Sequence, residues 1–430
     1  MASKRVFVRV GELAIPVGEL IISIDGKRET SSFKYDASWL DDPRAFALSP
    51  GLALTDAPYF FSGDRGSALP PPIGDGTPDS WGRAVIKATL GGRACSELDF
   101  LLHSTDFLRS GALRFYESRD ADAPALAQHS PDGTQFTIPR LIDLEKFIIE
   151  ARAFEADPAR YREKRADLVS GGRLGDVVGT LGGARPKINA IDNGNLWIVK
   201  LAKMNDQYSV AHGEVLALNL AKAVGINACE ATVLPSSQTY PVAMVRRFDR
   251  TGEGARRPYI SAQTFMELPG AEAGNYADIA FQMNEWSADP VSEKAELFRR
   301  VAFNILIQNT DDHLRNLGFL YGGNGKWLLS PTFDINPVPE IGSSLKTAVS
   351  EIHGTELSIA NLIDAAPYFD IDTDKAAEVL YDMAATIASQ WRREAAKIKM
   401  SGADIRYLTP AFDNSQVEDA LMLKTKSGKV

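Results

Sequence analysis

The side chains best suited to chemistry are concentrated in residues 309–337, "NTDDHLRNLGFLYGGNGKWLLSPTFDINP". Asp311 and Asn316 stand five positions apart, and Asp334 follows the short apolar run "KWLLS". This Asp-to-Asn spacing occurs in kinase loops, where the Asp orients the attacking hydroxyl and the Asn holds a magnesium ion. Mg²⁺ prefers oxygen ligands, so Asn316 and Asp334 suit it when phosphate and water complete the coordination. The stretch predicts a phosphotransferase site.

Taken one at a time, these residues have simpler explanations. Asn309, Thr310 and Asp311 are all good helix caps, and a single His313 is more often a hydrogen-bonded structural histidine. The spacing favours the magnesium interpretation, because a metal ion and phosphates compensate acids that are otherwise costly to bury.

The glycine-rich stretch "GTLGGARPK" (residues 179–187) is a candidate phosphate-binding loop. It is neither G-x-G-x-x-G nor a Walker A motif, so its position is more informative than its pattern. Asn193-Gly194 between "KINAI" and "LWIVKL" predicts a hairpin, and the glycine-rich stretch leads directly into its first strand. Backbone N–H groups and Lys187 at this sheet edge would cradle phosphates.

Lys200 is the second candidate for phosphate binding. It shares a strand face with Leu196 and Ile198, where a solvated lysine is out of place. A kinase uses such a lysine to hold the nucleotide phosphates, with a helix glutamate to orient it, and Glu214 in "HGEVLALNLAKAVGI" is the candidate partner. A snorkelling surface lysine and a solvated helix charge are the alternatives.

The elements that position these residues are predicted from composition and periodicity. A chain of 430 residues exceeds one core, so we expect two or three domains. Alternation in "VFVRV" and "LIISI" predicts strands, and the polar segment 118–136 predicts a linker. Apolar residues at helical spacing predict long helices after about residue 290: Leu297, Val301 and Ile305, then Val379, Met383, Ile387 and Trp391. The expected fold is α+β, with a β-rich part (1–130), a mixed lobe (131–250) and an all-helical lobe (251–430).

Composition also disfavours several classes of protein. The net charge of −9 provides no basic field for a phosphate backbone, so direct DNA or RNA binding is disfavoured. Cys95 and Cys229 are too few for a disulfide framework and lack zinc-site spacing. The first residues lack the apolar core of a signal peptide, and no run of about 18 apolar residues predicts a membrane span. We expect a cytoplasmic protein.

The chain contains the motifs "GGARPK", "WIVKL", "RRFDR", "NTDDHLRN" and "LSPTFDINP" in that order, preceded by "FKYDASWL", "ALSPGLAL" and "PDSWGR". Together these motifs resemble the HipA family, bacterial toxin kinases of type II toxin–antitoxin modules. The resemblance implies a protein-kinase-like, two-lobed fold with an extra β-rich N-terminal subdomain. It also implies phosphorylation of serine or threonine that depends on ATP and Mg²⁺.

The resemblance extends to individual residues. It implies that Asp311 is the catalytic base, that Asn316 and Asp334 bind the metal, and that Lys200 binds phosphate. The matched nucleotide loop comprises Gly182, Gly183, Ala184, Arg185, Pro186 and Lys187. The hinge segment facing the adenine comprises Arg246, Arg247 and Phe248, and the other nucleotide-contact segments contain His313 and Phe333.

Regulation and partners are likewise implied by the family. Its members phosphorylate a serine in the nucleotide loop, where this chain has Thr180, with Ser170 as the other candidate. A phosphate there would repel the ATP phosphates. The family implies a separately encoded helix-turn-helix antitoxin, similar to HipB, and DNA contact only through that partner. Its targets include aminoacyl-tRNA synthetases, whose phosphorylation stops translation and growth.

Two other functions remain compatible with the motifs. A small-molecule phosphotransferase has the same two-lobed architecture, and fold alone does not separate it from a protein kinase. A nucleotide-binding corepressor scaffold would be catalytically silent. The scaffold would not need Asp311, Asn316, Lys200 and Asp334 together.

Overall fold

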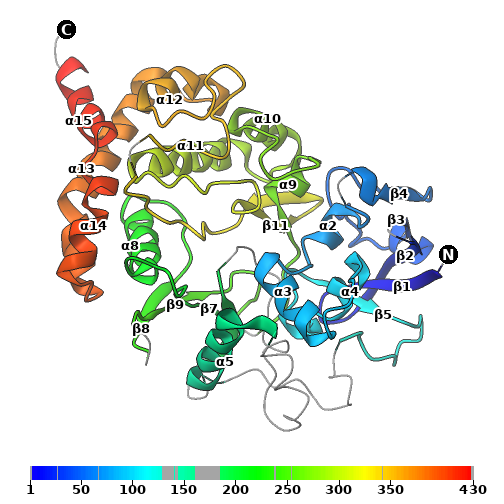
Figure 1. Ribbon diagram of the computed structural model, residues 1–430. Helices are drawn as coiled ribbons and strands as arrows, with labels where there is room; N and C mark the ends of the chain where they lie inside the picture. The colour runs from blue at the N-terminus through cyan, green and yellow to red at the C-terminus, as the bar shows by residue number, and fades with distance from the viewer. Residues whose placement is uncertain are drawn as a thin grey trace. The chain divides into compact units, whose positions relative to one another are not determined.

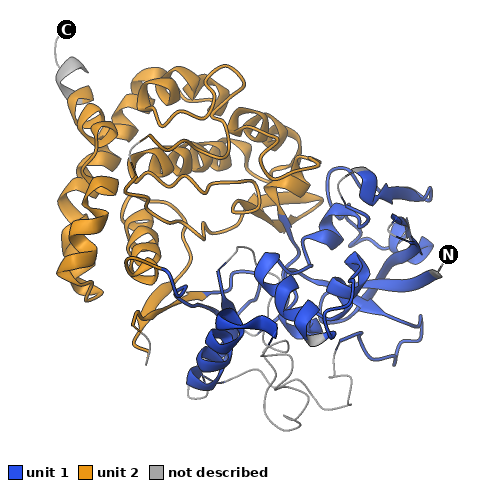
Figure 2. Cartoon of the chain, viewed as in Figure 1, with its two compact units in different colours: residues 1–205, 246–260 blue, residues 206–245, 261–430 orange. Residues whose placement is uncertain are grey.

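The computed structural model describes residues 2–26, 28–65, 67–127, 140, 144–159, 185–236, 239–252, 254–340 and 342–427. The chain forms two compact units (Figure 2). Unit 1 contains residues 1–205 and 246–260, and unit 2 contains residues 206–245 and 261–430.

Unit 1 begins with an antiparallel sheet in the order β4-β3-β2-β1-β5 (Figure 1). Its strands are β1 (Ala2–Val10), β2 (Ile15–Asp25), β3 (Arg28–Tyr35), β4 (Tyr59–Ser62) and β5 (Leu113–Tyr116). Alternate residues such as Val6, Leu20 and Phe33 are fully buried, as expected for strands with one face on a core. The predicted β-rich N-terminal part is confirmed.

Unit 1 also contains helices and a further hairpin. The helices are α1 (Ala37–Leu40), α2 (Pro71–Gly74), α3 (Ser80–Thr89), α4 (Glu97–Leu102) and α5 (Leu144–Ala156). The hairpin consists of β6 (Lys187–Asp192) and β7 (Asn195–Lys200). Its turn residues Asn193 and Gly194 have φ angles of 47° and 76°. Two positive φ angles are what a two-residue type I′ hairpin turn requires. The hairpin prediction is confirmed.

Unit 2 is mostly helical. Its helices are α8 (Val210–Ala223), α9 (Ala262–Phe265), α10 (Tyr276–Trp286), α11 (Pro290–Leu306), α12 (Ile359–Ala365), α13 (Thr373–Lys397), α14 (Gly402–Phe412) and α15 (Ser415–Ser427). Helices α11 and α13 coincide with the predicted apolar periodicities, and their residues Leu297, Ile387 and Trp391 are fully buried. Within the described parts of both units, no helix is long and apolar enough to cross a membrane.

The expectation of an all-helical lobe after residue 251 needs correction. That region contains β10 (Tyr259–Ser261) and a hairpin of β11 (Gly318–Gly323) and β12 (Lys326–Leu329). Asn324 and Gly325 adopt φ angles of 52° and 73° between the hairpin strands. The sequence therefore contains a second Asn-Gly turn signal, and it places strands among the helices.

The two units divide the chain differently from the three predicted parts. Helix α8 and the hairpin of β8 (Ala231–Leu234) and β9 (Val242–Arg246) were expected in the mixed lobe, but they fall in unit 2 apart from Arg246. Helix α8 packs against α13, and Ala211, Val215 and Ala243 form a buried cluster that Ile398 contacts. Long-range packing, which local patterns do not reveal, decides this grouping. The three-part division remains a prediction.

Candidate active site

The loop that carries Asp311 begins directly after α11 and is fixed by buried asparagines. Asn309 is buried, and its Nδ2 donates to Asn304 Oδ1 at 2.9 Å. Its Oδ1 accepts the backbone N–H of Asn336 at 3.2 Å. One side chain therefore connects the end of α11, the Asp311 loop and the segment that carries Asp334.

Asp312 is the structural anchor of this loop. Its carboxylate accepts hydrogen bonds from the Tyr276 hydroxyl at 2.7 Å and from the backbone N–H of Lys346 at 2.6 Å. Its carbonyl accepts the Thr347 hydroxyl at 2.8 Å. Burial raises the pKa of Asp312 to about 6, although these hydrogen bonds act in the opposite direction. Sequence reasoning gave Asp312 no role, because its partners are distant in the chain.

Asp311 differs from its neighbour in being exposed. Its carbonyl accepts Asn316 Nδ2 at 2.7 Å, which closes the loop on itself. His313 Nδ1 accepts the backbone N–H of Arg315 at 3.3 Å, and the His313 carbonyl accepts that of Asn316 at 2.8 Å. His313 therefore shapes the loop, and the Asp311 side chain can reach a ligand from solvent.

Asn316 has the property expected of a metal ligand. Its Oδ1 is buried and accepts no hydrogen bond, which is costly unless a ligand compensates for the lost water. The Oδ1 atom of Asn336 is likewise buried and accepts no hydrogen bond. The Nδ2 atom of Asn336 lies 3.4 Å from Asp334 Oδ1. Asp334 has a φ of 55°, a left-handed conformation that is uncommon outside glycine and is often found at functional sites.

These oxygens fit a magnesium ion. Asn316 and Asp334 offer an amide oxygen and a carboxylate, the hard donors that Mg²⁺ prefers. The part of the chain that the structure describes contains no cluster of three or more His, Cys, Asp or Glu side chains able to hold a metal. A magnesium ion held by Asn316 and Asp334 would take its remaining ligands from phosphate and water, as is usual for kinases.

The segment around Asp334 is held by backbone pairing. Thr332 N–H donates to the Asn227 carbonyl at 2.8 Å, and the Thr332 carbonyl accepts the Cys229 N–H at 3.0 Å. Phe333, a predicted nucleotide contact, is half-buried in this segment. These bonds fix the left-handed turn at Asp334 from both sides, together with the Asn309–Asn336 contact.

A pH prediction follows from Asp312. The pKa of about 6 in the folded chain lies above the ordinary range of an aspartate, so the folded chain binds the proton more tightly than the unfolded chain. The contribution of Asp312 to the free energy of unfolding therefore falls by about 2 to 3 kcal/mol as pH rises from 4 to above 6. Urea unfolding at a series of pH values gives the free energy of unfolding of the wild type and of Asp312→Asn. The difference between the two proteins should show this fall, because the contributions of the other titrating groups are the same in both. A flat difference would contradict a buried, titrating Asp312.

In unit 1, Lys187 lies in a buried ion pair that the sequence did not predict. Its Nζ is 2.8 Å from Asp79 Oδ2, and both side chains are buried. Asp79 also caps α3 by accepting the Gly82 N–H at 3.1 Å. Asp79 belongs to the "PDSWGR" motif, so two distant motifs meet here. The predicted role of Lys187 as a phosphate ligand remains a prediction, and its ammonium already has this carboxylate partner.

Lys200 stands directly opposite Lys187 in the β6–β7 hairpin. It is 9% exposed, which contradicts the snorkelling alternative. Glu214, on α8 of unit 2, is 2% exposed and so is not a solvated helix charge. Both buried ionisable groups are consistent with the predicted functions. Their pairing with each other remains a prediction.

The "RRFDR" motif at residues 246–250 forms a buried charge network within unit 1. The Asp249 carboxylate accepts from Arg247 and Arg250, both at 2.7 Å, and from the Gly111 N–H at 2.9 Å. Arg247 also donates to the Leu108 carbonyl at 2.7 Å. Burial alone would raise the pKa of Asp249, but the two guanidinium groups outweigh it and hold the pKa well below its usual range.

This network changes the interpretation of the hinge residues. The Arg247 side chain is buried and attaches the hinge segment to the carbonyls of Leu108 and Arg109 in the same unit. Arg246 Nη2 donates to Asn195 Oδ1 at 2.6 Å, and the Phe248 ring lies 5.6 Å from the Tyr259 ring. That Arg246, Arg247 and Phe248 contact the adenine remains a prediction. In the structure, the Arg247 side chain has the structural role of holding this segment to the rest of unit 1.

Part of the predicted nucleotide loop lies outside the described residues. This applies to Gly182, Gly183 and Ala184, and to the candidate phosphorylation sites Thr180 and Ser170. Of the rest, Arg185 precedes β6, and the Pro186 carbonyl accepts the Leu201 N–H at 2.9 Å. These assignments remain predictions.

Comparison with known proteins agrees with the motifs. Residues 11–115 match the family model of the HipA N-terminal domain, and residues 179–391 match that of the HipA-like C-terminal domain. The HipA chain in the Shewanella oneidensis MR-1 toxin–antitoxin complex with HipB and operator DNA aligns with a TM-score of 0.68 and 16% identity, over 97% of this chain and 96% of that one. This structural match indicates the same kinase-like fold.

Curated relatives cover less of the chain. A putative kinase, Y4dM of Sinorhizobium fredii, is 32% identical over 34% of this chain and 39% of its own length. Toxin YjjJ of Escherichia coli is 26% identical over 43% of this chain and 45% of its own. The chain thus matches less than half the length of each. The two family models together span most of the chain, which belongs to the HipA family.

Proposed function

We propose that this protein is a toxin kinase that transfers the γ-phosphate of ATP to a serine or threonine of a cellular protein. The observation that carries the proposal is the arrangement in unit 2. An exposed Asp311 lies in a loop closed by Asn316, whose buried Oδ1 has no hydrogen-bond partner, and Asn309 ties this loop to the Asp334 segment. Fold alone would not distinguish this function from other phosphotransferases.

The chemistry requires little from the protein beyond positioning. Asp311 accepts the proton of the acceptor hydroxyl as its oxygen bonds to the γ-phosphorus. The bond from the γ-phosphorus to the β,γ-bridging oxygen breaks, and ADP leaves with that oxygen. Magnesium held by Asn316 and Asp334 would neutralise phosphate charge. Lys200 and the nucleotide loop would hold the remaining phosphates.

Within this proposal, the partner is a helix-turn-helix antitoxin. The Shewanella structure contains HipA with HipB and operator DNA, which supports a HipB-like partner for this chain. The acidic chain would then contact DNA only through the antitoxin. An aminoacyl-tRNA synthetase is the proposed substrate, and phosphorylation of Thr180 or Ser170 the proposed means of self-inhibition. ATP and Mg²⁺ are the proposed cofactors.

Growth of cells expressing the chain tests the toxin proposal. Induced wild-type protein should arrest growth, Asp311→Gln at equal abundance should not, and a co-expressed cognate antitoxin should restore growth. Equal arrest by both proteins would contradict a toxicity that depends on phosphate transfer.

The Asn316 assignment has its own test. Asn316→Ala removes one oxygen ligand, so the Mg²⁺ concentration for half-maximal phosphate transfer should rise by about tenfold or more. The measurement is a magnesium titration at saturating ATP. Asn284→Ala, on α10, is the matched control, because this asparagine is exposed. An unchanged magnesium requirement in Asn316→Ala would exclude the side chain as a ligand.

A further inference from the structure

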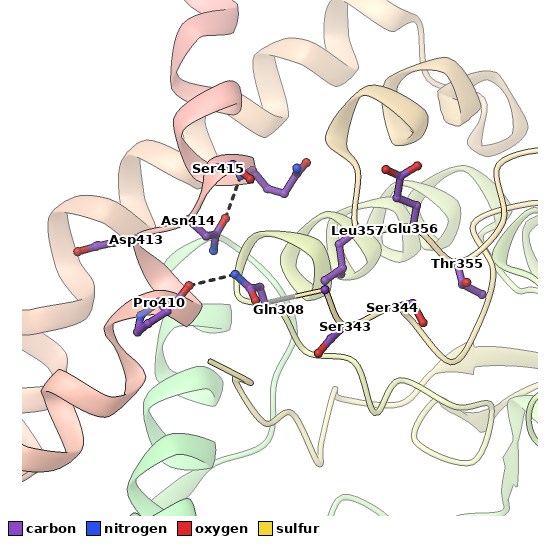
Figure 3. Close-up of a pocket in the computed structure, with 12 residues that line it drawn as sticks. Gln308, Ser343, Ser344, Thr355, Glu356, Leu357, Pro410, Asp413, Asn414 and Ser415 are labelled. Atoms are coloured by element: carbon purple, nitrogen blue, oxygen red, sulfur yellow. Dashed lines mark hydrogen bonds between the residues drawn. The ribbon is translucent and has the colours of Figure 1, made fainter. Parts of the chain in front are cut away.

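A cavity of about 720 Å³ in unit 2 has no role in the chemistry above (Figure 3). Three segments line it. They are Gln308 at the start of the Asp311 loop, residues 342–344 with 355–357, and the junction of α14 and α15, which contributes Pro410 and residues 413–416. Figure 3 shows the second and third segments on opposite sides of a common space, with Gln308 between them.

The junction of α14 and α15 is fixed relative to the Asp311 loop. Gln308 Nε2 donates to the Pro410 carbonyl at 3.0 Å, drawn as a dashed line in Figure 3. Asn414 Nδ2 donates to the Leu306 carbonyl at 3.0 Å, at the end of α11. This wall of the cavity is therefore attached to the chain immediately before Asp311.

The opposite wall is attached through Asp312. Its carboxylate and carbonyl hold Lys346 and Thr347, and the Leu345 N–H donates to the Thr355 carbonyl at 2.9 Å. One wall is thus bonded directly to the chain before Asp311, and the other is joined to Asp312 through residues 345–347. A ligand in the cavity would have a defined position relative to the Asp311 carboxylate.

The lining favours a ligand with hydrogen-bond donors and positive charge. Most of the described lining side chains carry hydroxyls, amides or carboxylates, and none of these described residues is Lys or Arg. Asp413 already accepts from Trp391 Nε1 at 3.0 Å and pairs with Arg392. Glu356 is exposed, and its carboxylate accepts one bond from Asn361, at 3.4 Å. Glu356 is therefore the acid best placed to attract a cation.

We propose that this cavity binds the segment of the protein substrate next to its acceptor hydroxyl, with Glu356 favouring a lysine or arginine there. The inference rests on the proposed kinase function. Gln308 precedes Asp311 by three residues, a separation of at most about 10 Å along the chain. A polypeptide acceptor positioned at Asp311 reaches the cavity within a few residues, whereas a small metabolite would leave it unused.

Peptide binding tests the proposal separately from catalysis. The probes are fluorescent peptide pools with a central Ser or Thr and either Lys/Arg or Asp/Glu flanks, and the measurement is fluorescence anisotropy with the full chain. The basic pool should bind about tenfold tighter than the acidic pool at low salt. Glu356→Lys should abolish or reverse this preference, and Ser344→Trp, at an exposed lining position, should weaken both pools by filling the space.

Glu378→Lys is the matched control, because Glu378 is an exposed acid on α13 away from the cavity lining. It should bind both pools as the wild type does. The proposal would be overturned if the wild type bound neither peptide pool. It would also be overturned if the wild type, Glu356→Lys and Ser344→Trp bound the pools with equal affinity. Variant-sensitive binding without any phosphate transfer by the wild type would instead refute the kinase function and support the peptide site.

Discussion

Asp311→Gln should lower phosphate transfer by about 10²- to 10⁴-fold while leaving ATP affinity and stability close to those of the wild type. The reason is geometric. Asp311 is exposed and contributes its carbonyl, rather than its carboxylate, to the loop. The substitution removes the group that orients the hydroxyl and accepts its proton, and it leaves the fixing bonds of Asn309 and Asp312 in place.

The measurements are single-turnover transfer from labelled ATP, calorimetric titration with ATP and Mg²⁺, and thermal unfolding. Glu378→Gln changes an exposed carboxylate in the same unit and should behave as the wild type. Full transfer activity in Asp311→Gln would show that another residue serves as the base. A large loss of stability would instead show that the carboxylate is structural.

Asp249→Asn should destabilise unit 1 by about 3 to 5 kcal/mol, the typical cost of removing one partner from a buried ion pair. Asp249 is fully buried and balances the charges of Arg247 and Arg250. Asparagine keeps the size of the side chain but removes its charge, so two buried guanidinium groups lose their counter-ion. Urea unfolding monitored by tryptophan fluorescence measures the effect.

Glu117→Gln is the control for this experiment. Glu117 forms an exposed ion pair with Lys4 in the same unit, and exposed pairs contribute little to stability. We expect the control to unfold as the wild type does. If Asp249→Asn matched the control, the "RRFDR" network would be dispensable for folding, and its residues would be free for a role in nucleotide binding.

Features encoded by neighbouring residues could be predicted from the sequence. The Asn193-Gly194 turn specifies its hairpin locally, and the spacing of Asp311 and Asn316 places them in one short loop. The periodicity of Leu297, Val301 and Ile305 specified α11 for the same reason. In each case the physical cause acts over a few residues, so a single sequence contains the signal.

Features that depend on distant partners could not be predicted. Asp79 and Lys187 are 108 positions apart, and Arg247 reaches a carbonyl 139 positions away. Asp312 had no predicted role, yet its bonds to Tyr276 and Lys346 make it an anchor of the loop. The buried, unbonded Oδ1 of Asn316 is also invisible in a sequence, because burial is set by the whole unit.

Phosphate transfer to a cellular protein is tested by incubating the purified protein with γ-labelled ATP and Mg²⁺ in a cell lysate, beside Asp311→Gln, and mapping the phosphorylated sites by mass spectrometry. We predict a discrete labelled protein that is absent with Asp311→Gln, with phosphate on a serine or threonine. Label on Thr180 or Ser170 of the chain itself would identify the regulatory site. No labelled protein in either sample, despite measurable ATP binding, would contradict the assignment as a protein kinase.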